Sequence, residues 1–416
     1  MSHLRCQRCL FCMDNNTVTV VGGGLGGLIT AISAAEAGAP VHLKEQHSRL
    51  GGRARSGVGP YVPNDGPHVL YADGAFWPWL VERHLAAPYR RLPLRPASQI
   101  RFRLDGRRRA LPPVGLLALF SHRGRSAPID QDFRSWLKAT SGEGIADIAS
   151  AFMGVVTYTA DSGDLSAKFV WDRLLRVGNP TGGPRYLVGG WQALVDRLVQ
   201  HARGLGVVID TETPVTELPG GPTVIATSLA SARRLLARPL PTPAISGSTV
   251  LLDVAIKPRR GDAFIVSDLD QPGWAEAFSR VDKTLSADGT VLIQAQRPVQ
   301  PGETQPQAAA AIATLVDSGW PGWQERASWQ RSGVANHRTG ALDMPGYDWH
   351  DRPAVDQGDG IFLAGDETAA PGLLSEVSFH SAVIAATAAA TYLNQKDRKL
   401  GRIYPDSPRG EALTGS

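Results

Sequence analysis

Cysteine is nearly absent from this chain of 416 residues, since its three cysteines, Cys6, Cys9 and Cys12, all lie close to the N-terminus. No disulfide can therefore staple the body of the fold, which agrees with a reducing cytoplasm. The C-x-x-C-x-x-C spacing is typical of iron–sulfur or zinc ligands, but a fourth cysteine is missing and His3 is the nearest substitute. We predict no metal site, and interpret residues 1–13 as a disordered extension or a misassigned start before Met13.

Long apolar runs are also missing. No stretch has the length of a membrane span, and no signal-peptide pattern is found. The 43% hydrophobic and 20% charged residues are those of an ordinary globular protein. A chain of 416 residues exceeds what one hydrophobic core usually serves. We therefore expect a cytoplasmic protein of two domains.

Acidic residues are scarce in one segment. Between Arg83 and Arg125 there are 11 arginines and one acid, Asp105, so the segment carries +10 and the rest of the +4 chain carries −6. Residues 99–111 alternate around an Asp-Gly turn, which predicts a hairpin, and the apolar stretch Leu111 to Phe120 follows. Two interpretations remain open: residues 99–125 dock on the inner face of a membrane, or a solvated hairpin precedes a core helix. No base-reading module accompanies the arginines, so we expect no nucleic-acid binding.

A glycine-rich turn stands near the front of the chain. The β-branched run from Thr17 to Val21 leads into Gly22-Gly23-Gly24-Leu25-Gly26-Gly27, and helix-forming residues follow from Leu28 to Ala37. In a G-x-G-x-x-G pattern Gly22 makes the tight turn, Gly24 lets the backbone approach a pyrophosphate, and Gly27 lets helix and strand pack closely. The helix N-terminus from Leu25 onward then favours phosphate. A second strand, Pro40 to Lys44, ends at Glu45, which suits the hydroxyls of a ribose.

The next motif indicates whether the expected cofactor is NAD or FAD. Arg49-Leu50-Gly51-Gly52-Arg53 follows the acid closely, and the whole run from Val18 to Ser56 resembles the N-terminal signature of the FAD-dependent amine oxidase and phytoene desaturase superfamily. The resemblance implies FAD as the cofactor, with Gly52 and Arg53 at its diphosphate. A guanidinium suits phosphate oxygens. A solvated arginine in a basic loop is the alternative. By the same resemblance, Gly66 lies where the chain passes the flavin.

Two later stretches are similar to the same superfamily. A helix beginning at Gly189–Leu194 leads to a strand at Val207–Ile209 and then to Thr213–Glu217, which implies that the backbone of Val215 holds the adenine end. Val215 as a plain core-strand residue remains the alternative. A further sheet strand is expected from Thr223 to Thr227.

The C-terminal motif consists of a strand from Gly360, the turn Gly365-Asp366, and a helix from about Ser375 to Tyr392. It resembles the superfamily's flavin motif. The resemblance implies that Asp366 binds the ribityl chain or, through water, a phosphate. It also implies that the backbone N–H groups of Glu376 and Val377 lie near flavin N1 and O2, where a helix N-terminus stabilises negative charge.

The fold class implied by these motifs is α/β, with a Rossmann-like FAD-binding domain of the glutathione reductase type and an interleaved α+β substrate domain. Because the motifs are dispersed, we expect both domains to be discontinuous. The FAD domain is predicted to comprise residues 14–75, 185–245 and 330–396, and the substrate domain residues 76–184 and 246–329. Residues 397–416, rich in charge, Pro and Gly, are predicted to form a loose tail.

One departure from the family pattern bears on the substrate. Amine oxidases usually place an aromatic residue after the Gly-Asp-like turn, but this chain has Gly372-Leu373-Leu374-Ser375 there, so an amine would lose one cation–π partner. We therefore expect a phytoene dehydrogenase-like enzyme that transfers hydride from a C–H of a small hydrophobic, carotenoid- or terpenoid-type substrate to flavin N5. Oxygen or a quinone is the expected electron acceptor, since no second nucleotide-binding turn is found. A flavin amine oxidase and a non-catalytic prenyl or lipid carrier are the alternatives.

The catalytic residues are not determined by the sequence. Several side chains are candidate proton acceptors, namely His337, Asp161, Glu376 and His380, while His68 is interpreted as structural. A group of aromatic residues either walls a substrate cavity or packs in the core: Trp320, Trp323, Trp329, Tyr347 and Trp349.

Overall fold

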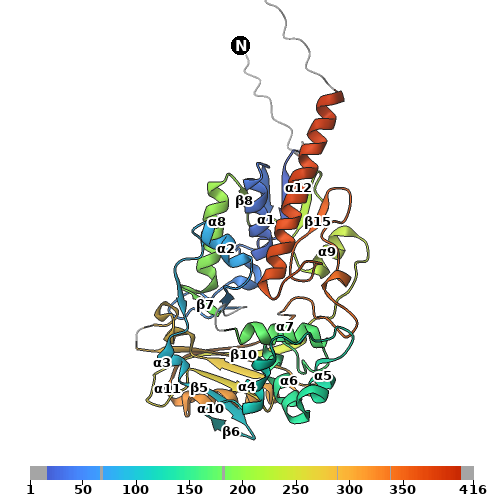
Figure 1. Ribbon diagram of the computed structural model, residues 1–416. Coiled ribbons are helices and arrows are strands. Elements are labelled where there is room, and N and C mark those ends of the chain that lie inside the picture. The colour runs from blue at the N-terminus through green and yellow to red at the C-terminus, as the bar shows by residue number, and fades with distance from the viewer. Residues whose placement is uncertain (1–15, 66–68, 180–182, 288, 338, 404–416) are drawn as a thin grey trace, which may run out of the picture.

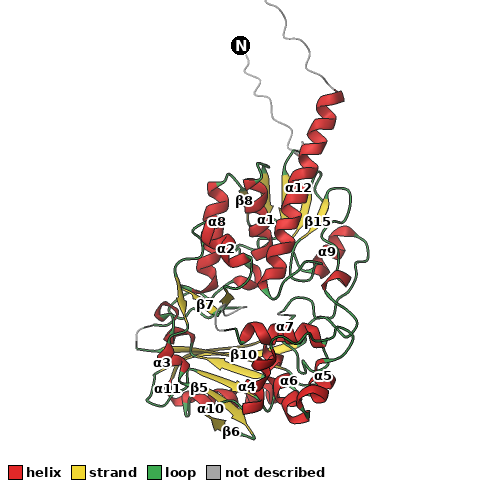
Figure 2. Cartoon of the chain, viewed as in Figure 1, coloured by secondary structure: helices red, strands yellow, loops and turns green. Residues whose placement is uncertain are grey.

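The structure is a computed structural model that describes residues 16–65, 69–179, 183–287, 289–337 and 339–403. Figure 1 shows two halves: a helix-covered parallel sheet in the upper half, and a larger sheet with its helices in the lower half. Segments from the beginning, middle and end of the chain meet in the upper half (Figure 2). The cysteines and Met13 lie outside the described residues, as do Gly66 and His68.

The upper sheet is entirely parallel, with strand order β15-β9-β1-β2-β8. Its strands are β1 (Val18–Val21), β2 (Val41–Lys44), β8 (Val208–Asp210), β9 (Thr223–Ile225) and β15 (Ile361–Leu363). Three helices pack on it: α1 (Leu25–Glu36), α8 (Gly190–Gly204) and α12 (Ser375–Ile403). Their apolar faces join the central strands in one buried core, so the predicted Rossmann-like α/β architecture is confirmed.

Two helix boundaries differ from the sequence prediction. Helix α1 begins at Leu25 rather than Leu28, because Gly24 is still extended and acts as the N-cap. Helix α12 continues to Ile403, past the expected end at Tyr392. Residues 397–403 are expected to be loose, but the helix continues through them, where Arg398, Lys399 and Leu400 favour it, so this part of the tail prediction is wrong.

The lower sheet has seven strands in the order β14-β10-β13-β12-β11-β5-β6. They are β5 (Ile100–Leu104), β6 (Arg107–Arg109), β10 (Ser248–Ile256), β11 (Ile265–Asp268), β12 (Gly273–Glu276), β13 (Val291–Pro298) and β14 (Ala327–Asn336). Helix α10 (Gln305–Gly319) packs its apolar residues against one face. A helical layer lies beside the sheet: α4 (Val114–Leu119), α5 (Phe133–Ser141), α6 (Glu143–Thr157) and α7 (Ala167–Val177).

A small antiparallel sheet joins the two halves. It consists of β3 (Leu70–Tyr71), β7 (Pro184–Leu187) and β4 (Tyr89–Arg91). The remaining α-helices are short: α2 (Phe76–Glu82), α3 (Leu94–Ala97), α9 (Leu229–Leu236) and α11 (Trp323–Arg326).

The expected domain limits do not coincide with the sheets at two points. Helix α2 follows the expected end of the first FAD-domain segment, yet it packs its apolar side chains in the core of the upper half. The limit at residue 330 falls inside β14, which belongs to the lower sheet. The division into two interleaved domains otherwise stays a prediction.

The basic segment forms the predicted hairpin. β5 and β6 pair antiparallel around Asp105 and Gly106, which have φ angles of 54° and 69°, as a tight hairpin turn requires. Helix α4 buries Leu116 and Leu119, so it is in part the core helix considered as the alternative. Among the described residues no helix has the length and apolar character needed to cross a bilayer.

Candidate functional site

The glycine-rich turn lies at the carboxyl edge of the parallel sheet, between β1 and α1. Gly22 has φ of 106°, and a Cβ there would lie 2.7 Å from the carbonyl oxygen of Ala226. A Cβ on Gly27 would collide with the Gly22 carbonyl, so strand and helix are in direct backbone contact. A Cβ on Gly24, in contrast, would meet no described atom within 4 Å. Gly24 therefore presents its open side to solvent at the place where a close ligand approach was predicted.

The Gly-Gly-Arg element lies against this turn. The Gly51 N–H donates to the Gly23 carbonyl at 2.8 Å. Gly52 adopts φ of 54°, and a Cβ on it would lie 3.3 Å from Gly24 Cα. Glycine at both positions thus allows the two backbones to touch, and it places Arg53 beside the N-terminus of α1.

Glu45 is buried at the end of β2 and is held by the backbone. One carboxylate oxygen accepts a hydrogen bond from the Gly23 N–H at 2.6 Å, and the other accepts from the His47 N–H at 2.9 Å. The Thr213 N–H donates to the Glu45 carbonyl at 2.8 Å, which brings the segment carrying Val215 past this edge. Val215 itself is half-buried and irregular, so its interpretation as a core-strand residue is wrong. Its predicted contact with adenine stays a prediction.

Arg53 and Asp366 join the two ends of the chain. Arg53 Nη2 lies 2.5 Å from Asp366 Oδ1, although 313 positions separate the residues. The Asp366 carboxylate raises the pKa of the Arg53 guanidinium, and this effect exceeds the lowering of the pKa by burial. Arg53 is exposed and also paired with Asp366, so its contact with a diphosphate stays a prediction beside the alternative of a solvated arginine. The preceding Gly365 is anchored by its N–H, which donates to Ser381 Oγ of α12 at 2.9 Å.

These groups fit a dinucleotide cofactor. No described side chain caps α1, so its first N–H groups are left for an anion. A permanent cation, an open glycine face and a buried carboxylate stand around the same helix end, which matches the donors and acceptors of a diphosphate and a ribose. Gly66 cannot be placed, because it lies outside the described residues. The cofactor roles of all these residues stay predictions.

The first turn of α12 uses its backbone differently from what was expected. The N–H groups of Glu376 and Val377 donate to the carbonyls of Leu373 and Leu374 at 3.1 and 3.3 Å. The Glu376 side chain is buried and accepts a hydrogen bond from the Phe76 N–H at 3.2 Å. Burial raises the pKa of its carboxyl group. The proposed contacts with flavin N1 and O2 stay a prediction, and the buried side chain of Glu376 stays a candidate proton acceptor.

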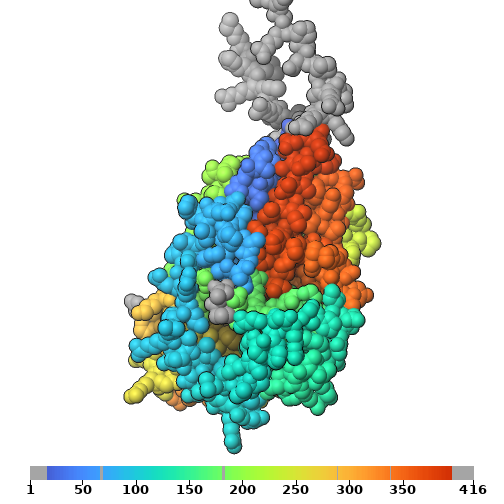
Figure 3. Space-filling view, viewed as in Figure 1, coloured from blue at the N-terminus to red at the C-terminus, as the bar shows by residue number. Residues whose placement is uncertain are grey.

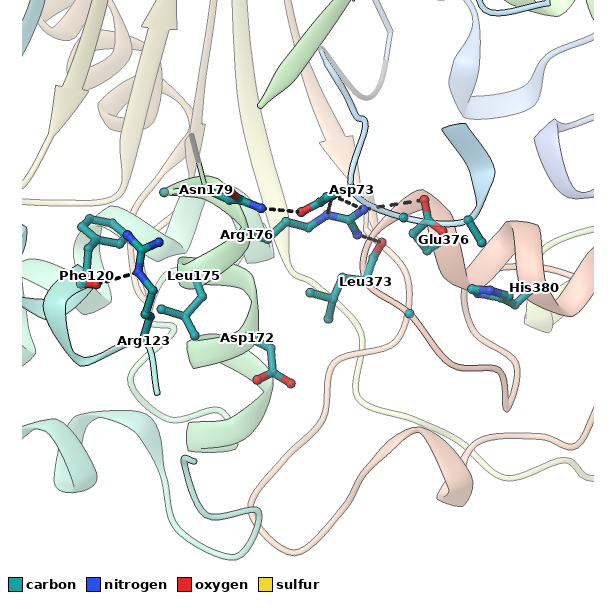
Figure 4. A pocket seen from close by; sticks show the side chains of 14 residues that line it. Asp73, Phe120, Arg123, Asp172, Leu175, Arg176, Asn179, Leu373, Glu376 and His380 are labelled. Atoms are coloured by element: carbon teal, nitrogen blue, oxygen red, sulfur yellow. Dashed lines mark hydrogen bonds and ion pairs between the residues drawn. The ribbon is translucent and has the colours of Figure 1, made fainter. Parts of the chain in front are cut away.

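A charged cluster surrounds this carboxylate (Figure 4). The Arg176 guanidinium on α7 lies 2.7 Å from Asp73 and 3.6 Å from Glu376, and it donates to the Leu373 carbonyl at 2.9 Å. The cluster ties α7, from the lower half, to the start of α12, from the upper half. Sequence reasoning missed Arg176 and Asp73, because neither belongs to a recognisable motif.

The cluster forms one wall of an open cavity of about 590 Å³. The rest of the lining combines apolar, polar and charged groups. These other residues are Gly74, Ala75, Phe120, Arg123, Asp172, Leu175, Gly178, Asn179, Gly372 and His380. Figure 3 also shows a hollow between the blue and teal parts of the surface, with the yellow strands of the lower sheet at its depth. A small molecule can therefore reach the junction of the two halves from outside.

The four candidate proton acceptors separate in space. Glu376 and His380 line the cavity. Asp161 instead pairs with Arg134 at 2.8 Å, and His337 Nδ1 lies 2.8 Å from the Ser246 carbonyl. Only the two cavity residues are therefore placed to act on a molecule bound there.

The aromatic group does not wall this cavity. Trp320 and Trp323 are buried in the core of the lower half, and Trp329 stacks on Tyr61. Tyr347 is 60% exposed, and Trp349 stacks on His350. The core-packing interpretation is therefore correct for Trp320 and Trp323, and none of the five residues lines the cavity.

A buried polar row crosses the lower sheet and was not predicted. Adjacent strands place Arg331, Asp253, Gln294 and Glu276 in register. Gln294 accepts from the Asn64 N–H and donates to the Asn64 carbonyl, both at 3.1 Å, and Arg331 pairs with Asp65 at 2.8 Å. The row therefore fixes the segment that leads into Gly66.

Glu276 ends this row without a cationic partner among the described residues. Its carboxylate accepts hydrogen bonds from Tyr186 Oη at 2.7 Å and Trp274 Nε1 at 3.2 Å. Burial raises the pKa of Glu276 to about 7, against the lowering effect of these two donors. Burial likewise raises the pKa of the nearby Tyr71 to about 12. This region of the sheet is thus a poorly solvated environment for charge.

Comparisons with known proteins agree with this architecture. Residues 20–92 match the family model of the NAD(P)-binding Rossmann-like domain. An oxidoreductase from Methanosarcina mazei superposes with a TM-score of 0.71 at 16% identity, over 89% of this chain and 99% of that one. Cyclohexylamine oxidase from Brevibacterium oxydans superposes with a TM-score of 0.67 at 15% identity, over 92% of this chain and all of that one.

One curated relative matches over a short stretch. It is a carotenoid 3,4-desaturase from Haloarcula japonica, 55% identical over 42 residues, which is 10% of this chain and 8% of that protein. The fold resemblance inferred from the sequence is therefore confirmed, and both an amine oxidase and a desaturase are among the similar proteins.

Proposed function

We propose that this chain is an FAD-dependent oxidoreductase that removes hydride from a C–H of a small hydrophobic molecule, in the manner of a phytoene dehydrogenase-like desaturase. The observation that carries the proposal is the Arg53–Asp366 ion pair beside the open face of Gly24. It unites two motifs from opposite ends of the chain at the helix end where a dinucleotide diphosphate is favoured. FAD, when bound, supplies the hydride acceptor.

The chain's own residues bind, orient and shield in this proposal. Arg53 neutralises diphosphate charge, and Glu45 accepts hydrogen bonds from a ribose in addition to those from the backbone. The cavity at the start of α12 receives the substrate. Of the candidate proton acceptors, Glu376 and His380 line it, and burial raises the pKa of the Glu376 carboxyl.

The hydrophobic substrate class is supported by Leu373 in the cavity wall, where amine oxidases usually carry an aromatic residue. The desaturase match, though short, points the same way. Oxygen or a quinone is proposed as the electron acceptor.

A flavin amine oxidase is the second candidate. It is favoured by the carboxylates of Asp73 and Glu376 in the cavity wall, which would attract an ammonium group, and by the fold likeness to cyclohexylamine oxidase. Arg176 weakens this candidate, because its guanidinium already lies beside both acids and offsets one of their two negative charges.

Anaerobic titration of the flavin-loaded protein tests the proposal. Detergent-solubilised carotenoid precursors and terpenoids, and separately a series of alkylamines, are added while the absorbance of oxidised flavin is followed. We expect loss of that absorbance with a hydrocarbon and not with amines. Bleaching by amines alone would select the second candidate. Tight hydrocarbon binding without any bleaching would indicate a carrier. Readmission of oxygen or of a soluble quinone then identifies the electron acceptor.

A further inference from the structure

The surface around α4 combines exposed apolar side chains with arginines. We define the basic surface as residues 105–125, which comprise the β5–β6 turn, β6, α4 and the following loop. Three of its apolar side chains are well exposed: Leu111 at 74%, Val114 at 82% and Leu117 at 51%. Helix α4 is anchored in the core by Leu116 and Leu119. Leu111, Val114 and Leu117 are not members of that core. Val114 and Leu117 lie on α4 and Leu111 shortly before it, so exposed apolar side chains are gathered in one segment, which marks a candidate interaction surface.

Most of the positive charge here is not neutralised by the protein. Arg109 pairs with Asp105, and the nearby Arg103 pairs with Asp268. Arg107 and Arg125, in contrast, form no salt bridge with any residue that the structure describes, and both are exposed. Exposed apolar residues flanked by unpaired arginines match the two attractions that an anionic bilayer offers, namely an apolar interior and negative headgroups.

The basic surface is continuous with the cavity. Phe120 and Arg123, which directly follow α4, line it together with Leu175 and Leu373. In Figure 1, β6 and α4 lie at the lower end of the molecule, away from the parallel sheet, and a projection coloured like β6 is seen there in Figure 3. A flat layer can therefore meet this end without covering the helix end assigned to the cofactor.

We propose that the basic surface docks on an anionic lipid bilayer, with Leu111, Val114 and Leu117 in the headgroup region and the arginines on lipid phosphates. The docked molecule turns the α4 side of its cavity toward the membrane, so an apolar substrate passes in past Phe120 without crossing water. This delivery route rests on the proposed function, whereas the docking itself does not.

Vesicle flotation with the full-length protein tests the docking. Vesicles of phosphatidylcholine alone are compared with vesicles that also contain phosphatidylglycerol. We expect binding to the anionic vesicles only. The double variant Val114→Ser/Leu117→Ser is expected to bind at least about tenfold more weakly, because two apolar side chains lose their burial. The double variant Arg107→Gln/Arg125→Gln loses about fivefold per arginine.

Matched controls come from the other end of the molecule. Val208→Ser on edge strand β8, where the side chain is 54% exposed, and Arg203→Gln on α8 change the same residue types far from α4. Both controls should bind like the unaltered protein, and all variants should keep its unfolding temperature because every altered side chain is exposed.

Three outcomes would overturn the proposal. They are failure to bind anionic vesicles, equal weakening by the controls, and binding that depends on the arginines but not on Val114 and Leu117. The last outcome, with equal retention on heparin, would identify a general polyanion surface. Flavin content is measured on the same samples, so loss of docking is distinguished from failure of the flavoenzyme assignment.

Discussion

At the scale of single residues, the candidate cofactor site depends on the glycines of the α1 turn and on the Arg53–Asp366 ion pair. The glycines at positions 22, 24 and 27 follow from backbone requirements that a short sequence displays. Arg53 and Asp366 were each assigned to a cofactor by resemblance, yet nothing in the sequence indicates that they contact one another. The polar row ending at Glu276 depends on the register of strands far apart in the chain, which alternation within one strand does not determine.

Removal of the Arg53 guanidinium tests the cofactor site. Arg53→Ala removes a charge-assisted partner of the expected diphosphate, so FAD affinity should fall roughly 10- to 100-fold. Flavin fluorescence during titration of the apoprotein measures this affinity. Arg203→Ala, which removes an exposed arginine from α8, is the matched control and should leave it unchanged. Unaltered FAD affinity in Arg53→Ala would remove this residue from the site.

Glu276 gives a stability that depends on pH. Its pKa is about 7 in the folded protein against 4.5 for the free group, so the folded state holds the proton more tightly. The cost of the buried carboxylate is therefore absent below pH 4.5, grows between the two values, and is complete above pH 7.

Glu276→Gln removes that cost. The variant should gain stability relative to the unaltered protein as pH rises from 5 to 8, by an amount on the order of 2 kcal/mol. Urea unfolding at both pH values measures the difference. Glu325→Gln, which alters an exposed acid in helix α11, is the control. An equal effect of Glu276→Gln at both pH values would contradict the shifted pKa.

At the scale of elements, periodicity and turn chemistry predicted the strands and the three main helices of the parallel sheet, and the hairpin at Asp105-Gly106. The errors fall where packing rather than local sequence decides. The expected substrate domain begins at residue 76, but the apolar residues of α2, which follow directly, fill the core of the upper half. Helix α12 extends to Ile403 because charged helix formers follow its apolar face.

Two glycines of the α1 turn should respond in opposite ways to the same substitution. Gly24→Ala adds a methyl group that meets no described atom within 4 Å, in an extended conformation that alanine adopts, so unfolding free energy should fall by less than about 1 kcal/mol. FAD affinity should nevertheless fall roughly 5- to 100-fold, because the methyl group occupies the ligand side.

Gly27→Ala should instead lower the stability of the apoprotein. Its methyl group collides with the Gly22 carbonyl, so the apoprotein itself should lose about 1–3 kcal/mol or more of unfolding free energy. Denaturant unfolding of the two apoproteins and flavin titration separate the effects. Equal destabilisation with unchanged FAD affinity would contradict the ligand-facing role of Gly24.

At the scale of the whole molecule, the fold class could be predicted because three dispersed motifs all require one parallel sheet. The cavity could not, since it forms where α7 of the lower half meets the start of α12, and its Arg176–Asp73 pair has no motif. The halves are joined by ion pairs, so the interface between them carries both the cavity and the chain segment leading to Gly66.

The most direct test of this account is the visible absorbance spectrum of the purified protein, followed by identification of the cofactor released on denaturation. Glu45, Arg53 and Asp366 meet around one helix end, so the account predicts an oxidised-flavin spectrum and release of FAD. If the protein is purified without cofactor, it should take up added FAD and acquire that spectrum. A colourless protein that fails to bind added FAD would contradict the central claim.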